Sequence, residues 1–455
     1  MLKKFQESAL FSIALFAALI IIIVLTGRFL RSTYLPLLLL PLTLSGMYYY
    51  EVLSKVARLA YIGFLIAVIG LFSFSLFQSI KANVDNPREW DFVGFWLHGT
   101  TAVQGHNFYD PQYAQELARN MNLSEEFQHE IVDVGFWYPP PAIFLFLPLG
   151  WFNLQTASLV WNVAQVAVLV ACVVLLWKTF LVQTGLRGLL FVAALLVMLQ
   201  PTAGTFFFAQ TNFVALLWFI LFWRDRNRPR GGIWFALAVI TKPYMAFLGL
   251  YLLLLGRWRT ILISVGAVLV LCLLSMLVFG TSTFFSYFTS NPMSRLPTFI
   301  YNEADNQSLL ALILRTTQYD ITAHSPFSNP IFIVSALLLA GITGWLIYQV
   351  DAKYADWGIV FSLLLGLILY PTIGNHYLIQ FMVMFLVLWV NIDNLPGKQW
   401  GVIIFFTVVY MLLAKSVGLT TFLGIVLCWL TVTGIMLSAF KRKAIFQSPY
   451  LKGVA

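Results

Sequence analysis

Residues Leu59–Phe77, LAYIGFLIAVIGLFSFSLF, decide the fold class of this chain. The run has no charged side chain and is nearly as long as the roughly 20 residues that a helix needs to cross a bilayer core. Similar runs extend from Ala9 to Leu25 and from Ile331 to Ile347. Of the 455 residues, 60% are hydrophobic and only 10% are charged, too few charges to cover a soluble protein of this size. The sequence therefore predicts an integral, multi-pass α-helical membrane protein.

We expect a helical bundle of about 12 to 14 spans. The predicted spans lie near residues 9–27, 34–50, 59–80, 155–177, 186–205, 211–223, 231–241, 243–256, 259–280, 330–349, 356–373, 376–391, 399–414 and 417–440. Basic residues gather in short stretches between these spans, which is the pattern that keeps positive charge on the cytoplasmic side. The net charge of +9 therefore does not indicate a nucleic-acid partner.

The segment Gly231–Gly256 decides the topology. With the amino terminus inside, Arg257 and Arg259 fall on the cytoplasmic side only if this segment is a hairpin of two short helices. Pro243 supplies a break, because proline lacks a backbone donor and clashes with the preceding turn. The hairpin would place Lys242, the residue before this proline, at its outer tip.

The chain divides into five predicted regions. They are the first transmembrane helices (1–80), a first extracytoplasmic loop with an interfacial or re-entrant segment (81–153), a transmembrane core (154–280), a second extracytoplasmic loop (281–329) and the last transmembrane helices (330–455). Both loops are expected to carry short helices. The first is rich in aromatic residues, including Tyr109 and Tyr138, which suit either the membrane interface or the walls of a sugar site.

Asp91 is the first candidate for chemistry. It follows the Leu59–Phe77 span and is flanked by Trp90 and Phe92, where a carboxylate is poorly solvated. It is either a general base or a solvated carboxylate at a helix boundary. Farther along, the prolines 139–141 exclude a helix through these positions and predict an extended backbone, followed by an apolar stretch too short to span a membrane.

Several elements occur in an order that resembles glycosyltransferase family 87 of the GT-C superfamily. They are Asp91 with aromatic neighbours, Gly105 to Asp110, Tyr138 to Leu149, Gln210-Thr211-Asn212, Lys242-Pro243, Arg257-Trp258-Arg259, Asn306 to Leu309 with Arg315, and His376-Tyr377. The resemblance covers about residues 60–395. This chain departs from the family in two extra amino-terminal spans and in Ala209, which stands where the family usually has glycine before Gln-x-Asn.

The resemblance implies an inverting transfer of a hexose, with mannose as the default, from a polyprenyl-phosphate sugar. The acceptor would be a glycolipid or a glycan, and the site would face the outside of a bacterial plasma membrane. Asp91 would be the general base that removes the proton of the acceptor hydroxyl. Because a lipid phosphate leaves readily, cations would stabilise its charge in place of a general acid. The resemblance implies no nucleotide sugar, no metal and no cofactor.

The candidates for binding the donor phosphate are Lys242, Arg295, Arg315 and His376. For each, a structural alternative remains open. Lys242 can extend to the interface, the two arginines can pair with carboxylates of the second loop, and His376 can be a structural histidine. The candidates for binding the sugar or the acceptor are Tyr109, Tyr138, Gln210, Asn212, Asn306 and Gln307. Gln210 and Asn212 can also cap a helix.

A transporter or a flippase of lipid-linked sugars is the main alternative function. Short broken helices and a Lys-Pro pair in the membrane would suit one. The chain shows no convincing internal repeat, however, and nearly all its spans lack ionisable residues. It also contains no nucleotide-binding Gly-x-x-x-x-Gly-Lys loop and no cysteine or histidine pattern with zinc spacing.

Overall fold

The computed structural model describes residues 35–87, 91–121, 136, 138–290, 306–317, 325–349, 355–392, 398–414 and 418–441. These residues form helices, and no β-strand occurs among them. Five stretches are long and apolar enough to cross a membrane: Lys55–Asp85, Leu154–Met198, Trp258–Phe279, Pro330–Gln349 and Leu419–Ser438. The prediction of an all-α, polytopic membrane bundle is confirmed. The other predicted spans are shorter helices in the described residues, or lie before residue 35 and so outside them.

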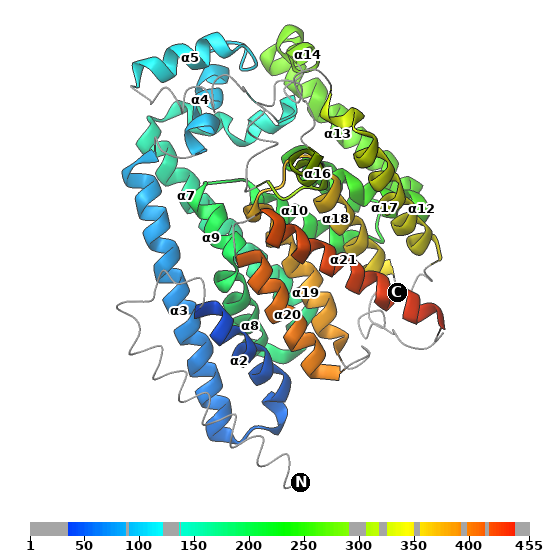
Figure 1. Cartoon of the computed structure of the whole chain (residues 1–455). Helices are drawn as coiled ribbons and strands as arrows, with labels where there is room; N and C mark the ends of the chain where they lie inside the picture. The colour runs from blue at the N-terminus through cyan, green and yellow to red at the C-terminus, as the bar shows by residue number, and fades with distance from the viewer. Residues whose placement is uncertain are drawn as a thin grey trace.

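The longest helix, α3 (Lys55–Asp85), runs along one side of the bundle (Figure 1). Its 31 residues span about 46 Å at 1.5 Å per residue, more than the roughly 30 Å of a hydrocarbon core. The helix starts at Ser54, whose hydroxyl accepts a hydrogen bond of 3.2 Å from the backbone nitrogen of Ala57. Helix α3 therefore reaches from one end of the bundle to the other.

Helix α7 (Leu154–Leu176) leads away from the end of α3, and helices α8 (Gly185–Met198) and α9 (Gln200–Phe207) lead back to it. Asn83, near the end of α3, bonds both to Ser158 at the start of α7 and to Phe206 at the end of α9. The chain must therefore reverse between these two contacts. It does so through a π-helical turn and a 3₁₀ turn that end at Gly185, whose φ of +60° favours glycine.

The predicted helical hairpin over residues 231–256 is confirmed. Helix α11 (Gly231–Thr241) ends at Lys242, where the backbone is extended with φ −145° and ψ +102°. The 3₁₀ turn η8 (Pro243–Phe247) and helix α12 (Leu248–Leu254) follow. They return the chain to the start of α11, because a Cβ atom at Gly232 would lie 2.2 Å from the carbonyl oxygen of Thr260. Proline is the first residue of the returning limb, where its missing donor costs no hydrogen bond. The hairpin is flanked along the chain by α10 (Asn212–Asp225) and α13 (Trp258–Phe279).

The first polar segment forms a small layer at one end of the bundle (Figure 1). It consists of α4 (Phe92–Val103), α5 (Pro111–Asn120) and the 3₁₀ turns η4 (Pro140–Leu145) and η5 (Leu147–Trp151). Pro139 has the predicted extended backbone, with ψ of +152°. The exclusion of any helix through 139–141 was wrong, because a 3₁₀ turn starts at Pro140. The first residues of such a turn need no backbone donor, so proline fits there.

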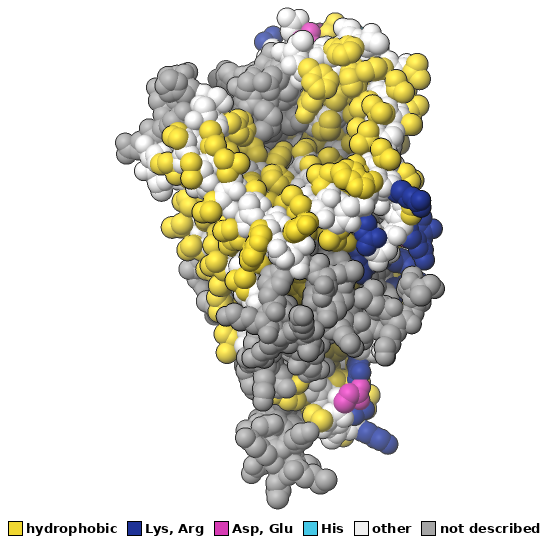
Figure 2. Space-filling model, turned by 90° about the vertical axis from the view of Figure 1, so that its right-hand side faces the viewer, with side chains coloured by type: hydrophobic (Ala, Val, Ile, Leu, Met, Phe, Trp, Pro, Cys, Tyr) yellow, Lys and Arg dark blue, Asp and Glu magenta, His cyan; other side chains and the backbone are white. Residues whose placement is uncertain are grey.

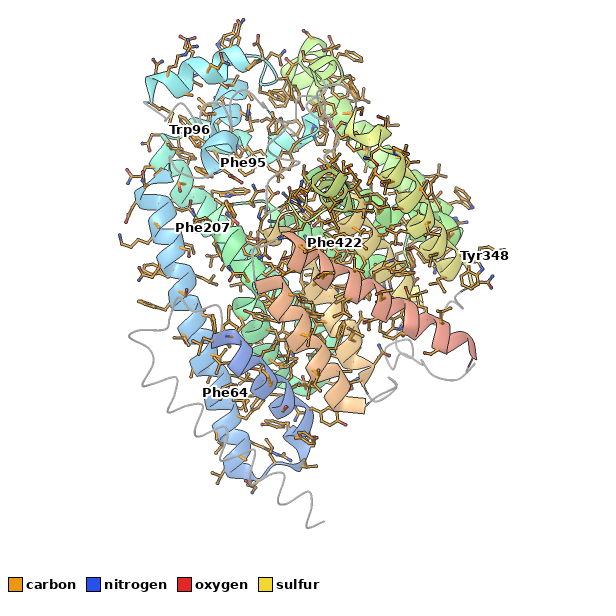
Figure 3. All side chains as sticks on the ribbon, in the orientation of Figure 1. Phe64, Phe95, Trp96, Phe207, Tyr348 and Phe422 are labelled. Carbon is orange, nitrogen blue, oxygen red and sulfur yellow. The ribbon has the colours of Figure 1, made fainter. Side chains whose placement is uncertain are left out.

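Two glycines bring α4 and η5 into backbone contact. A Cβ atom at Gly150 would lie 2.4 Å from the carbonyl oxygen of Gly99, and one at Gly99 would lie 2.5 Å from that of Phe146. Beside this contact, the rings of Phe95 and Phe146 stack with centroids 4.5 Å apart, and Trp96 donates to the carbonyl of Phe152 over 2.9 Å (Figure 3). The apolar stretch after the prolines therefore packs tightly against α4.

The second polar segment meets the first. Helix α14 (Thr281–Ser290) follows α13, and Asn107 donates a hydrogen bond of 2.9 Å to Ser286 in α14. The rings of Tyr109 and Tyr287 lie 5.5 Å apart. We call the end of the bundle that carries α4, α5, η4, η5 and α14 the site end.

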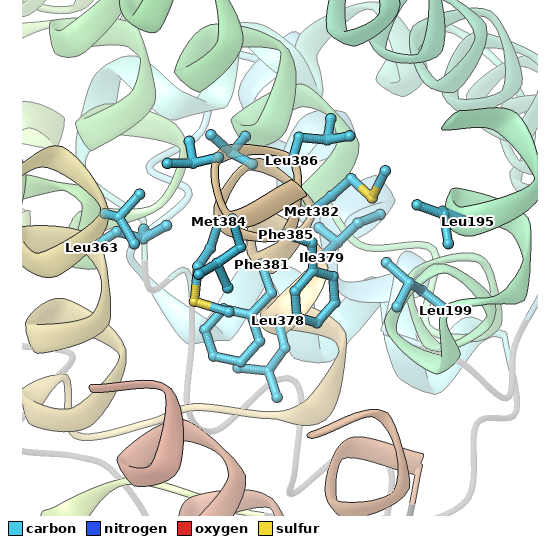
Figure 4. Close-up of a cluster of buried hydrophobic side chains, with 14 of the residues drawn as sticks. Leu195, Leu199, Leu363, Leu378, Ile379, Phe381, Met382, Met384, Phe385 and Leu386 are labelled. Atoms are coloured by element: carbon cyan, nitrogen blue, oxygen red, sulfur yellow. The ribbon is translucent and has the colours of Figure 1, made fainter. Parts of the chain in front are cut away.

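The remaining described helices complete the bundle. They are α2 (Leu35–Tyr49), α16 (Leu309–Thr317), η9 (Pro326–Ser328), α17 (Pro330–Gln349), α18 (Ala355–Leu369), η11 (Asn375–Gln380), α19 (Phe381–Val390), α20 (Lys398–Ala414) and α21 (Gly418–Lys441). Side chains of α8, α18, η11 and α19 form a buried apolar cluster (Figure 4).

Hydrophobic side chains cover much of the surface in Figure 2, as expected of a face in contact with lipid. One exposed ion pair, Lys81 with Asp85, lies near the end of α3. Other ionic contacts occur at the opposite end of the bundle, which we call the basic end. There Arg187 pairs with Glu51 at 2.5 Å and Arg226 with Asp356 at 2.7 Å.

Candidate active site

Asp91 lies where the chain passes from α3 into α4. It occupies the position before the first residue of α4, yet its side chain makes no capping hydrogen bond. Instead, its Oδ2 accepts a hydrogen bond of 2.5 Å from Nε2 of Gln210. The backbone carbonyl of Asp91 accepts a hydrogen bond from the backbone nitrogen of Gly94, in the first turn of the helix. The carboxylate is therefore directed toward a polar cluster between the helices.

Gln210 is held by a tight turn after α9. Its backbone nitrogen donates to the carbonyl of Thr205, and that of Ala209 donates to Phe206, as in the hydrogen-bond pattern that often ends helices. This pattern needs a left-handed residue, and Ala209 has φ of +50°. Trp161 donates a hydrogen bond of 2.7 Å to the carbonyl of Ala209, which fixes the turn further. The sequence departure at Ala209 therefore lies at the one described non-glycine residue with positive φ.

Lys242, at the tip of the α11–η8 hairpin, is only 1% exposed. Its Nζ donates hydrogen bonds of 3.1 Å to Oε1 of Gln210 and 3.0 Å to the hydroxyl of Tyr138. It also lies 4.2 Å from the ring centroid of Tyr377, a cation–π distance. The lysine is thus buried and bonded within the cluster; it does not extend to the surface.

Tyr138 closes the cluster from the first polar segment. Its hydroxyl lies 3.4 Å from Oγ1 of Thr211 and 3.5 Å from Oε1 of Gln210. Burial raises the pKa of the Tyr138 phenol well above its ordinary value, so the hydroxyl keeps its proton. Tyr109 donates a hydrogen bond of 2.7 Å to the backbone carbonyl of Tyr138 and so supports this position.

His376 borders the cluster without a described hydrogen bond to it. Its ring lies 4.8 Å from that of Tyr377 and 5.2 Å from that of Phe208, measured between centroids. Thr205, one turn before Gln210, donates to the backbone carbonyl of His376 over 3.4 Å. These contacts join the start of η11 to the end of α9.

Asn306 and its neighbours hold the chain that leads into η11. Nδ2 of Asn306 donates to the carbonyl of Pro371 over 2.9 Å, and its Oδ1 accepts from the backbone of Ser308 and Ile373. Arg315 donates to the carbonyl of Asn306 over 3.0 Å. The described contacts of Asn306 are therefore those of a clamp between two segments of backbone.

Two candidate residues of the sequence analysis, Gln307 and Asn212, are buried amides without a full set of partners in the described residues. Gln307 is 0% exposed, and neither its Nε2 nor its Oε1 has a hydrogen-bond partner among the described residues. Asn212 donates to Thr205 over 3.3 Å, while its Oδ1 has no partner in the same part of the chain.

The structure thus joins Asp91, Tyr138, Gln210 and Lys242 in one hydrogen-bonded cluster, the Asp91 cluster. Arg295 lies outside the described residues.

Sequence reasoning missed Thr211 and the lysine-facing ring of Tyr377, although both adjoin residues that it selected. It also missed the supports of Gln210. Asn83, which joins α3 to α7 and α9, was missed as well. Its position in an apolar helix could have identified it, because a buried amide needs a hydrogen-bond partner. In the described residues, no group of three or more His, Cys, Asp or Glu side chains could hold a metal ion.

Comparison with known proteins identifies the family. The sequence pattern of glycosyltransferase family 87 matches residues 136–373, more than half of the chain. The chain is also similar to a polyprenol-phosphate-mannose-dependent alpha-(1-2)-phosphatidylinositol mannoside mannosyltransferase of Mycobacterium tuberculosis, with 26% identity over 263 residues. That match covers 54% of this chain and 60% of the relative, less than two thirds of the relative's length. No solved structure matches the chain. The chain belongs to glycosyltransferase family 87.

Proposed function

We propose that the enzyme transfers a hexose from a polyprenyl-phosphate sugar to a lipid or glycan acceptor, with inversion at the anomeric carbon. Mannose is the proposed hexose, because the mycobacterial relative is named for it. The observation that carries the proposal is the Asp91 carboxylate, which is bonded to Gln210 and makes no capping bond to α4. A general base needs such a fixed carboxylate within reach of its substrate.

In the proposed reaction, Asp91 takes the proton of an acceptor hydroxyl while the hydroxyl oxygen attacks the anomeric carbon. The bond between that carbon and the phosphate oxygen breaks, and its electron pair leaves with the polyprenyl phosphate. The leaving group gains negative charge, which nearby cations and donors would stabilise. We propose Arg295, Arg315 and His376 for this contact.

Sugar hydroxyls are the proposed partners of the incompletely bonded amides. A buried amide without a hydrogen bond costs about 1–3 kcal/mol, and a hydrocarbon environment supplies no water to satisfy it. Among the candidates, neither amide atom of Gln307 has a partner in the described residues, and Oδ1 of Asn212 has none there. Gln380 is likewise fully buried, with both amide atoms unpartnered in the same part of the chain. Tyr109, Tyr138 and Gln210 are proposed to line the same site. Asn306 is proposed to shape the site through its backbone clamp.

The site end is proposed to face outside a bacterial plasma membrane. Arg187, Arg226 and Arg257 gather at the basic end. This concentration of positive charge supports an inward orientation of that end. The donor's lipid tail would then lie in the bilayer with its phosphate at the outer surface. No cofactor is proposed.

The test is sugar transfer in proteoliposomes from polyprenyl-phosphate sugars to lipid extract, with wild type and Asp91→Asn. The change keeps the size of the side chain and removes its basicity. Loss of a general base predicts a rate at least about 100-fold lower. Asp110→Asn is the matched control, because Asp110 caps α5 by accepting from Gln112 and asparagine caps equally well.

Equal rates for wild type and Asp91→Asn would remove Asp91 as the base while leaving the reaction class intact. A wild type that binds polyprenyl phosphate but transfers no sugar from any donor would contradict the proposed reaction and favour a flippase.

A further inference from the structure

The buried ammonium of Lys242 makes its described hydrogen bonds to groups that surround Asp91. Nζ bonds to Gln210 and Tyr138, and the same Gln210 amide bonds to Asp91 at its other end. The result is a line of groups from ammonium to amide to carboxylate. The Tyr377 ring covers the ammonium at 4.2 Å. A phosphate ligand would have to displace one of these neighbours to reach a side chain that is 1% exposed.

The chemistry of these groups allows one orientation of the Gln210 amide. A carboxylate only accepts hydrogen bonds, and an ammonium only donates them. The amide must therefore turn its NH₂ toward Asp91 and its oxygen toward Lys242. In the reversed orientation, the amide oxygen would face the carboxylate and the NH₂ would face the ammonium. Lys242 thus fixes the amide that holds the Asp91 carboxylate.

We propose that Lys242 is a positioning residue that orients the Asp91 carboxylate through the Gln210 amide, and that it does not bind the donor phosphate. The inference rests on the proposed function, since it assigns a role in the reaction of Asp91. It also explains why the lysine is placed at a helix break. The extended backbone at Lys242 ends α11 and lets the side chain reach Gln210, which lies 32 positions earlier in the chain.

The ammonium also acts on Asp91 electrostatically. The Gln210 amide bonds to both charged groups, so a single side chain separates the ammonium from the carboxylate. Among the described residues, the other titratable groups that face them are the phenols of Tyr138 and Tyr377 and the imidazole of His376. A positive charge near a carboxylate favours its ionised form, which is the form that a general base requires. Removing the charge of Lys242 should therefore raise the pKa of the base.

The test is a double-mutant cycle with Lys242→Met, Gln210→Leu and the combined variant, assayed by transfer from a mannosyl polyprenyl phosphate. Methionine keeps most of the lysine stem, and leucine removes both hydrogen-bonding ends of the amide. Because a base misplaced by about 1 Å can lose about 100-fold in rate, we expect each variant to lower kcat about 10- to 100-fold. The donor KM and the inhibition constant of free polyprenyl phosphate should stay near the wild-type values. Since both residues act along one line, the combined loss should match that of the worse single variant.

The pH dependence gives a readout that a purely structural role would not change. In Lys242→Met, the acidic limb of kcat/KM should move to higher pH, because the base stays protonated longer without the neighbouring charge. In Gln210→Leu, where the ammonium remains, this limb should move less.

Losses that multiply in the combined variant would overturn the inference. So would a Lys242→Met enzyme with weakened donor binding and weakened inhibition by polyprenyl phosphate, the signature of a phosphate ligand. If Lys242→Met does not fold, Gln210→Leu alone tests the proposal. A wild-type kcat for Gln210→Leu would contradict the positioning of Asp91 through the Gln210 amide. A wild type without any transfer activity would overturn the proposed function itself, which is a distinct result.

Discussion

The contact between Gly99 and Gly150 makes a sharp prediction for Gly150→Ala. An added Cβ would lie 2.4 Å from the carbonyl oxygen of Gly99 and 2.7 Å from the backbone nitrogen of Thr100. Both neighbours are backbone atoms of α4, so no side-chain rotation can relieve the clash. Restoring a normal contact requires α4 and η5 to separate by roughly 1 Å. Overpacking of this kind costs about 1–3 kcal/mol of folding stability.

The same shift should also lower activity. Asp91 sits at the start of α4, and a displacement of about 1 Å at a reacting group can cost about 100-fold in rate. Both effects can be measured by thermal unfolding in detergent and by sugar transfer in proteoliposomes. Gly70→Ala in α3 is the matched control, because a Cβ there meets nothing within 4 Å and alanine favours a helix. A Gly150→Ala protein as stable and as active as wild type would refute the close packing of α4 on η5.

Two further predictions concern His98 and Ala209. Burial lowers the pKa of His98 to about 4, whereas in the unfolded chain this pKa is about 6.5. Between these two pH values, the imidazole of His98 is mostly protonated in the unfolded chain and mostly neutral in the folded protein. Folding stability should therefore fall as pH drops through this window, by up to about 3 kcal/mol. Apparent melting temperatures at pH 7 and pH 5 should differ more for wild type than for His98→Gln, and equal differences would contradict this origin. Ala209→Gly should keep full transfer activity and gain stability, because a left-handed backbone costs a side-chain-bearing residue about 1–2 kcal/mol. Ala209→Val should lose stability, because a β-branched side chain fits a left-handed backbone worse than alanine does. An unaltered melting temperature for Ala209→Val would count against the strained turn.

The Asp91 cluster was only partly predictable from the sequence. Asp91, Tyr138, Gln210 and Lys242 stood out because polar groups are costly among apolar and aromatic residues. Their mutual bonds did not, because Asp91 and Gln210 are 119 positions apart and meet only through the packing of α3 against α9. The family resemblance suggested roles for these residues but gave no partner for Lys242.

Asn306 illustrates the opposite case. In the sequence it was a candidate for binding the sugar or the acceptor, as part of the Asn306 to Leu309 element that resembles family 87. In the structure its described bonds go to the backbone of Pro371, Ser308 and Ile373. Whether an amide serves a ligand or a neighbouring backbone depends on which chain segment lies beside it, and no local pattern records this.

The sequence by itself determined the helices of this protein and the break at Lys242-Pro243. Apolar runs and proline act within a few residues, so their effects can be seen without the fold. Only the tertiary structure decided which groups share a site. It brought the Lys242 ammonium to the amide that holds Asp91, and it placed α4 on η5 through two glycines. Such contacts depend on how helices far apart in the chain pack together, and side-chain spacing along the chain carries no information about that packing.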